Sequence, residues 1–338
     1  MSIAVRLFSI GWALGLASGV APGVAFPAGP APAAAPWTVQ DDEGRVLELP
    51  APAQRIVSLS PGATAMLFAA GAGDRVVGTA EYSLEPEAAR AIPRVGDAHG
   101  FDLERILSLH PDLVVAWPQG SSVGTLAQLE RLGLKVYHHR LQRLDALPLA
   151  IERLGRVADT APVAAGAAAV LRVRIGALRA AHAQATPRTI LLQLWDEPVF
   201  TVGGGQVLSD VLAACGYRNA FAELGGASPV VSREAVVARD PDAILALTDS
   251  PQGGGQWLAR WRALGALRAV RSGHLWAWGD PRLTRMGPQI VDAAEALCRA
   301  LDAGMPPGYS AATATAAVPA PAPAAASPAP TPPPARPR

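Results

Sequence analysis

The chain has 338 residues, of which 50% are hydrophobic, and a formal net charge of +1. This length suffices for two lobes of ordinary size, each with a buried core. Because Arg6, Arg336 and Arg338 lie in the terminal segments, the body between them carries a net charge of −2, and we expect neither nucleic acid nor an anionic membrane surface as a partner.

The N-terminus has the pattern of a secretory signal. Arg6 precedes an apolar run from Leu7 to Ala25, and Gly23-Val24-Ala25 offers small residues at a cleavage position. We therefore expect residues 1–25 to be a cleaved signal peptide that exports the protein to the bacterial periplasm. The alternative is a membrane anchor, but the run is short and is interrupted by Gly11, Gly15, Gly19 and Pro22. No cysteine lies near this site for a lipid anchor, and no later stretch suggests a transmembrane helix, so we expect no membrane insertion.

Two segments of biased composition flank the expected folded body. A Pro/Ala linker occupies residues 26–36, and residues 305–338 form a Pro/Ala-rich tail of low complexity that cannot build a core and is expected to be disordered. Between them we expect an N-terminal lobe over 37–158, a bridging helix over 159–186 and a C-terminal lobe over 187–304.

The folded body opens with a predicted β-hairpin, in which residues 37–40 and 45–49 alternate around a turn that contains Gly44. Short apolar runs then alternate with helical patterns. The expected buried strands are Arg55–Ser60, Val76–Ala80, Leu113–Trp117, Lys135–His139, Thr189–Trp195, Ala243–Leu247 and His274–Trp278. This alternation predicts an α/β protein with two Rossmann-like lobes built on parallel sheets.

A long helical pattern separates the two sets of strands. It runs from Ala161 to Ala185, with apolar residues at helical spacing at Val163, Ala167, Val170, Leu171, Ile175 and Leu178. About 23 helical residues would span about 35 Å, which is too long for an ordinary crossover between neighbouring strands. The pattern therefore predicts one helix that spans both lobes.

The two sets of strands also share a plan that repeats at a constant interval. Glu104 and Glu234 are 130 positions apart, and so are Asp112 and Asp242. In each half a capped helix with glutamate in its first turn leads through a Pro-Asp turn to a buried strand. The repeat indicates two related lobes.

Several short motifs, in order, carry a family resemblance: Arg55-Ile56-Val57-Ser58-Leu59-Ser60-Pro61, Leu103-Glu104-Arg105-Ile106, Pro111-Asp112-Leu113-Val114 and Val231-Ser232-Arg233-Glu234. From about Arg55 to Leu301 the chain resembles the helical-backbone (class III) periplasmic substrate-binding proteins, which serve ATP-driven importers of cobalamin, haem and ferric siderophores. Within this class it looks most like the cobalamin-binding members. The resemblance implies two lobes joined by one long helix, with the ligand held in the cleft between them.

The resemblance also implies ligand-contacting residues. Tyr82, Trp117 and Arg285 match family positions at the cleft, and His99 lies in a matching loop, where it could line the cleft or approach the cobalt. Trp195 follows a buried strand and should point at the same cleft. The plainer interpretations are a core residue for Trp117 and a surface aromatic for Tyr82. Asp280 lies close to a family aspartate, but aligning the two needs a shift.

Glu104 and Glu234 match the family's docking glutamates, one on each lobe, and would meet arginines of an inner-membrane permease dimer that works with ATPase subunits. The plainer interpretation is complementarity to the helix dipole.

The chain contains two cysteines, Cys215 and Cys298. In an oxidising compartment an even count favours a disulfide, although two buried free thiols are the alternative. Both positions match cysteines of the cobalamin-binding members, and the resemblance therefore implies that they are bonded to each other.

Other classes of function fit the sequence less well. The six histidines show no spacing typical of a catalytic zinc site, and the tight pair His138-His139 should point to opposite faces of its strand. We therefore expect no enzyme, no metal site and no cofactor, with cobalamin as cargo. A metal-dependent periplasmic enzyme remains a lower-ranked alternative. Inside the class, haem and ferric siderophores remain alternatives, because Tyr82 or His99 could serve haem as an axial ligand.

Overall fold

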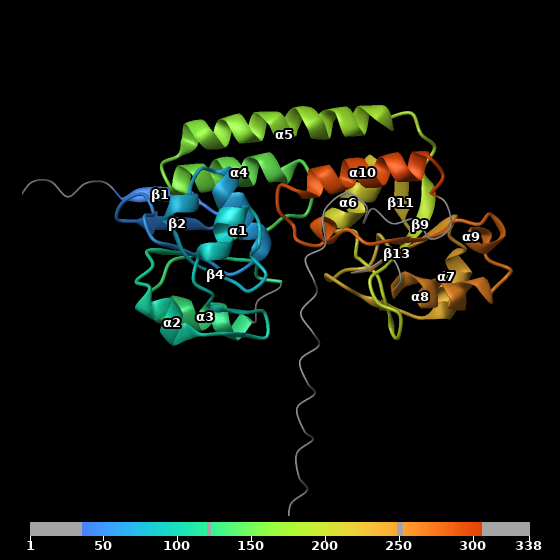
Figure 1. The fold of residues 1–338 in the computed structure, drawn as a ribbon, viewed down its shortest axis with the longest axis horizontal. Coiled ribbons are helices and arrows are strands. Elements are labelled where there is room, and N and C mark those ends of the chain that lie inside the picture. The colour runs from blue at the N-terminus through green and yellow to red at the C-terminus, as the bar shows by residue number, and fades with distance from the viewer. Residues whose placement is uncertain (1–35, 120–122, 249–252, 306–338) are drawn as a thin grey trace, which may run out of the picture. The chain divides into compact units, whose positions relative to one another are not determined.

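The computed structural model describes residues 36–119, 123–248 and 253–305 (Figure 1). The expected signal peptide lies outside the described residues. So do the expected linker, apart from Pro36, and the expected tail, apart from Met305.

Two four-stranded parallel sheets form the framework. The first has the order β4-β3-β7-β8, with strands β3 (Ile56–Ser58), β4 (Val76–Thr79), β7 (Leu113–Ala116) and β8 (Val136–His138). The second has the order β11-β9-β13-β14, with strands β9 (Arg188–Gln193), β11 (Tyr217–Asn219), β13 (Ala243–Leu247) and β14 (Leu275–Trp278). In both sheets the second strand lies on one side of the first, and the third and fourth lie on the other. The shared topology confirms the expected α/β fold with two related lobes.

Helices and short antiparallel strand pairs complete the body. The helices are α1 (Pro61–Ala69), α2 (Leu103–Ser108), α3 (Val123–Arg131), α4 (Ala146–Val157), α5 (Ala161–Ala181), α6 (Val207–Ala214), α7 (Arg233–Arg239), α8 (Gly253–Arg262), α9 (Arg268–Arg271) and α10 (Ile290–Asp302), with 3₁₀ turns η1 (Gly73–Arg75), η2 (Glu87–Ala91) and η3 (Pro281–Leu283). The antiparallel pairs are β1 (Trp37–Gln40) with β2 (Val46–Leu49), β5 (Gly96–Asp97) with β6 (Gly100–Phe101), and β10 (Val199–Phe200) with β12 (Val230–Val231). The expected N-terminal hairpin is thereby confirmed.

Strand β11 is the element of the two sheets that the sequence pattern does not predict. Its three residues sit at a sheet edge and include the exposed Arg218. A strand this short, with a charged centre, gives neither the alternation nor the apolar run that identifies strands in a sequence.

The 130-residue repeat corresponds to an equivalent contact in each lobe. The Asp112 carboxylate accepts hydrogen bonds from the backbone N–H of Gln54 at 2.7 Å and of Arg55 at 3.1 Å. The Asp242 carboxylate likewise accepts one from the backbone N–H of Thr189 at 2.8 Å. Each aspartate thus ties the start of the third strand of its sheet to the start of the first, which explains why both halves keep the Pro-Asp turn.

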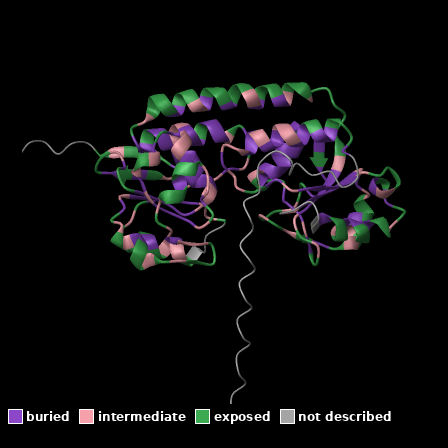
Figure 2. Cartoon of the chain, viewed as in Figure 1, coloured by how far each residue is buried: buried purple, intermediate pink, exposed green. Residues whose placement is uncertain are grey.

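Helix α5 is the expected long helix, and its 21 residues span about 32 Å. It ends at Ala181 rather than Ala185, and its buried face comprises Ala164, Ala168, Leu171, Ile175 and Leu178. Val163 and Val170, which also follow the helical spacing, are instead exposed. Figure 2 shows exposed residues along much of the length of this helix. By length and composition alone α5 could cross a membrane, contrary to our expectation that no later stretch approaches such a span.

The contacts of α5 nevertheless make it part of the folded body. In Figure 1 it lies alongside α4 and α10, which belong to different lobes. Arg174 of α5 forms ion pairs with Asp292 at 2.5 Å and with Glu295 at 2.8 Å, both on α10. A membrane-spanning helix would have to give up these charge pairs, so the contacts support a bridging role for α5.

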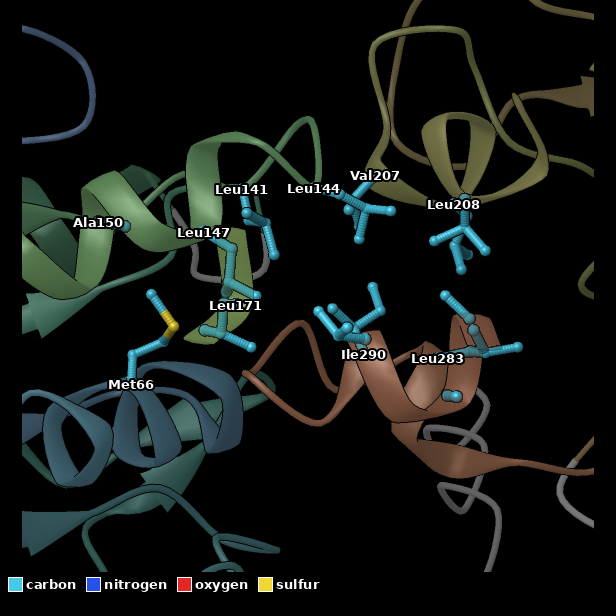
Figure 3. Packing of buried hydrophobic residues seen from close by; sticks show 14 of the residues in the cluster. Met66, Leu141, Leu144, Leu147, Ala150, Leu171, Val207, Leu208, Leu283 and Ile290 are labelled. Atoms are coloured by element: carbon cyan, nitrogen blue, oxygen red, sulfur yellow. The ribbon is translucent and has the colours of Figure 1, made fainter. Parts of the chain in front are cut away.

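Below α5 the two lobes share one hydrophobic core. Figure 3 shows side chains from both lobes in the same cluster: Met66, Leu141, Leu144, Leu147, Leu171, Val207, Leu208, Leu283 and Ile290. The buried carboxylate of Asp210 on α6 adds polar contacts between the lobes. It accepts a hydrogen bond from the backbone N–H of Leu144 at 2.8 Å and forms an ion pair with Arg179 at 2.7 Å. Opening the lobes widely would expose this core, so we expect a small range of hinge motion.

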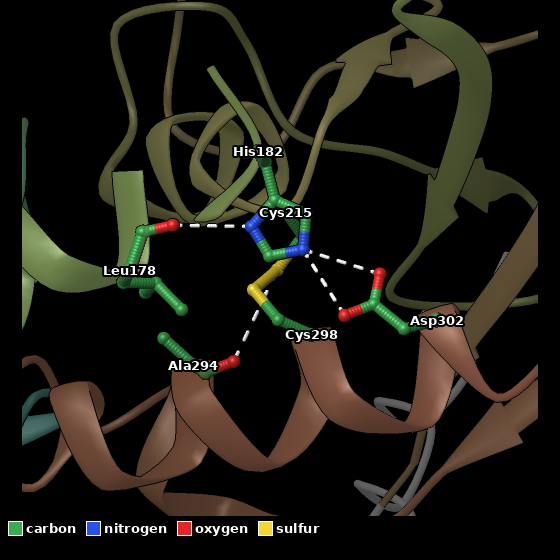
Figure 4. The surroundings of a disulfide bond; sticks show 6 residues. All are labelled: Leu178, His182, Cys215, Ala294, Cys298 and Asp302. Atoms are coloured by element: carbon green, nitrogen blue, oxygen red, sulfur yellow. Dashed lines mark hydrogen bonds and ion pairs between the residues drawn. A yellow bond between two sulfur atoms is a disulfide. The ribbon is translucent and has the colours of Figure 1, made fainter. Parts of the chain in front are cut away.

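A disulfide joins Cys215, after α6, to Cys298 of α10, with the two Cα atoms 4.9 Å apart (Figure 4). It confirms the pairing that the family resemblance implies.

His182, just beyond α5, lies beside this disulfide. Its Nδ1 is 3.1 Å from the Leu178 carbonyl oxygen, and its Nε2 is 3.1 Å from the Asp302 carboxylate. Burial acts to lower the pKa of His182, but these hydrogen bonds outweigh it and raise the pKa above its ordinary value.

The raised pKa predicts a pH-dependent contribution of His182 to stability. Because the folded protein holds the proton more tightly, the contribution is complete below the unfolded pKa of about 6.5 and is lost as pH rises through the folded pKa. We expect His182→Gln to lower the melting temperature more at pH 5.5 than at pH 8.5, as measured by calorimetry. The same pH trend should weaken in Asp302→Asn; an equal loss at both pH values would contradict the assignment.

The two adjacent histidines each pair with a carboxylate of the N-terminal hairpin. His138 Nδ1 lies 2.7 Å from Glu43, and His139 Nδ1 lies 2.8 Å from Asp42, so each ring pairs with its own carboxylate on the turn between β1 and β2. These contacts dock the N-terminal hairpin onto the end of β8. Within the described ranges no group of three or more His, Cys, Asp or Glu side chains is placed to hold a metal ion.

Candidate functional site

Two tryptophans lie at equivalent places in the two sheets. Trp117 directly follows β7, and Trp195 follows β9 by two residues. In each sheet the first and third strands are neighbours, and the strand order changes direction between them. Ligands of open α/β sheets bind at such switch points. Both residues therefore flank a position that favours ligand binding.

The two indoles differ in exposure. The Trp195 side chain is 58% exposed, although the loop that carries it is held at its base by the buried Gln193. Trp117 is half-buried, and its indole N–H donates a hydrogen bond to Gln119 at 2.8 Å. Trp195 thus presents a large apolar face to solvent, whereas Trp117 has its polar atom already satisfied and offers mainly ring surface.

Tyr82 and Arg285 are brought together from opposite lobes. Both line a small depression together with Gly62, Glu85 and Gln289. The phenol side chain is 60% exposed. Arg285 forms an ion pair with Glu85 at 3.3 Å, which crosses from one lobe to the other. The sequence analysis missed Glu85 and Gln289, since neither belongs to a recognisable pattern.

The lobes touch closely beside this depression. A β-carbon at Gly62, in the first turn of α1, would lie 2.2 Å from the Arg285 carbonyl oxygen. Only glycine permits this approach of the backbone segments. The enclosed volume of this depression is about 10 Å³, room for about one water molecule, so a large ligand cannot be held by this depression alone.

His99 and Asp280 lie outside this group. The His99 side chain is 95% exposed in the loop between β5 and β6, next to Asp97 at 3.4 Å. Asp280 is buried and is engaged by Arg282 at 2.7 Å, so its carboxylate already has a partner. Within the described ranges no hydrogen bond, ion pair or ring contact joins His99, Trp117 or Trp195 to the Tyr82–Arg285 pair, and their roles in one site remain predictions.

Glu104 and Glu234 occupy the second residue of α2 and of α7, and both are exposed. Asp102 and Ser232 cap these helices by accepting hydrogen bonds from backbone N–H groups at 2.9 and 3.1 Å. Because each helix runs antiparallel to the strand that follows it, its N-terminus lies at the carboxyl edge of the sheet. Hydrogen bonds from its own backbone N–H and from Ser232 lower the pKa of Glu234, which keeps it charged.

The comparisons with known proteins bear on this geometry. The family profile described as "Periplasmic binding protein" matches residues 56–281, which include both sheets. The chain belongs to the periplasmic binding protein family. The vitamin B12-binding protein of Vibrio cholerae is 36% identical over 256 residues, which cover 76% of this chain and 92% of that protein.

Solved structures agree with this assignment to the family. The structure of the periplasmic vitamin B12 binding protein of Vibrio cholerae matches with a TM-score of 0.68 and 35% identity, covering 75% of this chain and 98% of that one. A periplasmic haem-binding protein from Roseiflexus matches with a TM-score of 0.63 and 28% identity, covering 75% and 99%. The fold is therefore that of the class III periplasmic binding proteins.

Membership of the periplasmic binding protein family settles the broad class of activity. The curated relatives are binding proteins, and this chain is a binding protein rather than an enzyme. The family works in the periplasm, and its role in transport implies a membrane permease as partner.

Proposed function

We propose that this protein captures one cobalamin in the cleft between its lobes and delivers it to an inner-membrane permease dimer driven by ATPase subunits. The observation that carries the proposal is the 36% identity with the vitamin B12-binding protein of Vibrio cholerae, over 92% of that protein. Cobalamin is then transported cargo rather than a cofactor. Export would depend on residues 1–25 acting as a cleaved signal peptide.

The chemistry of a corrinoid fits the side chains at the carboxyl edges of the two sheets. A corrinoid is a large, partly apolar disc with an amide-bearing rim. Apolar discs pack against aromatic faces, which Trp117, Trp195 and Tyr82 would supply. Arg285, on the second lobe, pairs with Glu85 of the first lobe. When the ligand replaces Glu85 as its partner, Arg285 would donate hydrogen bonds to carbonyl groups on the corrinoid rim.

Haem is the second candidate cargo. A haem-binding protein shares the fold at 28% identity, and the exposed phenol of Tyr82 is a possible axial ligand for haem iron. Ferric siderophores rank below haem because no separate observation favours them. Tyr82→Phe separates the two main cargoes: it removes an iron ligand but keeps the ring that a corrinoid would contact.

The decisive experiment is titration of the purified mature protein with cyanocobalamin and, separately, with haem. We expect saturable calorimetric binding of cyanocobalamin at one molecule per chain. Trp195→Ala should weaken it roughly 10- to 100-fold, because a large exposed aromatic at the centre of a binding site contributes much of the affinity.

The matched control is Trp37→Ala, which also removes an indole. The Trp37 indole N–H donates to the Arg156 carbonyl oxygen, next to the last residue of α4 and remote from the strand ends that carry Trp195. Its loss should leave ligand affinity unchanged. Binding of haem without binding of any corrinoid would overturn the proposed cargo.

A further inference from the structure

Helix α8 carries three side chains that converge on the loop of Trp195. Trp257, Arg260 and Trp261 lie at positions i, i+3 and i+4, so they share one face of the helix. The sequence analysis assigned no role to any of them. Each makes a different kind of contact with the segment from Gln193 to Glu197.

The first contact is between two indoles. The ring centroids of Trp195 and Trp257 are 5.9 Å apart, with an angle of 61° between the ring planes. This edge-to-face arrangement is a favourable geometry for aromatic pairs. Trp257 is half-buried and packs against the second lobe's hydrophobic cluster, whereas Trp195 is 58% exposed. The anchored ring therefore restricts the exposed one.

The other two contacts hold the loop backbone. The Trp261 indole N–H donates a hydrogen bond at 2.8 Å to Gln193, whose side-chain amide in turn donates to the Trp195 carbonyl oxygen at 3.2 Å. Arg260 forms ion pairs with Asp196 at 3.0 Å and with Glu197 at 2.6 Å. The loop is thus fixed on both sides of Trp195.

Helix α8 packs closely against the second sheet. A β-carbon at Gly254 would lie 2.5 Å from the Ala277 side chain of β14, so glycine allows the helix to approach the sheet closely. Trp261 is 1% exposed and belongs to the core cluster of this lobe. The face that supports Trp195 is therefore built on a rigid part of the fold.

We propose that Trp257, Arg260 and Trp261 are positioning residues that hold the Trp195 indole ready to meet the flat face of the cargo. This inference rests on the proposed function. A ring that is already oriented loses less conformational freedom when it binds, and affinity rises accordingly. An apolar ring exposed to water is energetically unfavourable. Contact with the cargo accounts for the exposure of the Trp195 ring, and α8 supplies the contacts that orient it.

The test combines ligand affinity with a measurement that needs no ligand. Trp257→Leu should weaken cyanocobalamin binding about 3- to 10-fold, the range that corresponds to loss of one aromatic pair, and Trp257→Phe should restore it to within about 2-fold. In a Trp195→Ala background, Trp257→Leu should change affinity less than about 2-fold, since the ring to be positioned is gone. Additive losses in this double-mutant cycle would overturn the proposal.

Fluorine NMR of protein labelled with fluorotryptophan reports the ring directly. The resonance that disappears in Trp195→Phe identifies Trp195. In Trp257→Leu we expect the line width of this resonance to decrease and its chemical shift to move toward that of a mobile ring. In Trp257→Phe we expect neither change. An unchanged resonance would contradict positioning even if affinity fell. Failure of the wild type to bind any corrinoid would instead contradict the proposed function, and this NMR result would still stand on its own.

Two further variants separate positioning from general destabilisation. Leu264→Ala removes a side chain packed against the same cluster, so it should lower the melting temperature and leave affinity unchanged. Arg260→Gln removes the charge that pairs with the exposed Glu197 and with the largely buried Asp196, and it should fold yet weaken binding about 2-fold. A loss of affinity in Leu264→Ala as large as in Trp257→Leu would overturn the proposal.

Discussion

Replacing Glu104 and Glu234 together with arginine is expected to reduce cobalamin uptake in cells by at least about 10-fold, while cobalamin affinity in solution changes less than about 3-fold. Both glutamates are exposed in the first turns of α2 and α7, at the carboxyl edges of the two sheets. If they meet permease arginines, the double reversal sets like charges against each other, which opposes docking rather than merely removing an attraction. Uptake of labelled vitamin in a strain without the chromosomal gene measures this effect.

The competing explanation is that these residues only complement helix dipoles. Reversal would then cost about 0.3–1 kcal/mol per helix, lower the melting temperature modestly and leave uptake intact. Glu48→Arg with Glu87→Arg is a matched control, because it makes the same change of charge at two exposed sites of the first lobe. Normal uptake by the Glu104/Glu234 variant at normal abundance would end the docking hypothesis.

Removing the disulfide is expected to destabilise the protein strongly. The bond links Cys215 to Cys298, which are 83 positions apart. A cross-link that closes a loop of this length lowers the entropy of the unfolded chain and contributes about 4–5 kcal/mol in the chain-entropy model. We expect Cys215→Ala/Cys298→Ala to melt on the order of 10 °C below wild type, as followed by calorimetry.

Two controls identify the bond as the cause. Wild-type protein treated with reductant should melt close to the double variant, since both lack the same cross-link. A non-reduced digest of protein taken from the periplasm should contain one peptide pair joined through Cys215 and Cys298. Two alkylatable thiols in that material, or equal melting temperatures, would contradict the assignment.

Local patterns in the sequence were sufficient to predict the α/β class and seven of the eight strands of the two parallel sheets. Strands such as β7 and β13 are short apolar runs bounded by turn residues, and that pattern reflects burial on both faces of a parallel sheet. The Ala-rich stretch of α5 has a high intrinsic tendency to form a helix, and its length alone indicated a bridge. Repeated motifs at a fixed interval indicated two related lobes, because the same capping and turn chemistry recurs at Asp112 and Asp242.

The tertiary structure decided which chemically equivalent residues are buried and which segments meet. Val163 and Val170 follow the helical spacing as well as Leu171, yet they face solvent, because neighbouring helices cover one side of α5 only. The shared core between the lobes depends on contacts between residues that are far apart in the chain, such as Met66 and Ile290, and no local pattern specifies them.

The same distinction applies to the candidate site. Tyr82, Trp117, Trp195 and Arg285 were identified as individual residues from matched motifs and from their positions after strands. The sequence did not reveal that Glu85 pairs with Arg285 across the lobes, or that Trp257 supports Trp195, since each contact joins separate elements. A sequence pattern records the local conformation of its own segment, whereas partners in space are chosen by how the completed elements pack.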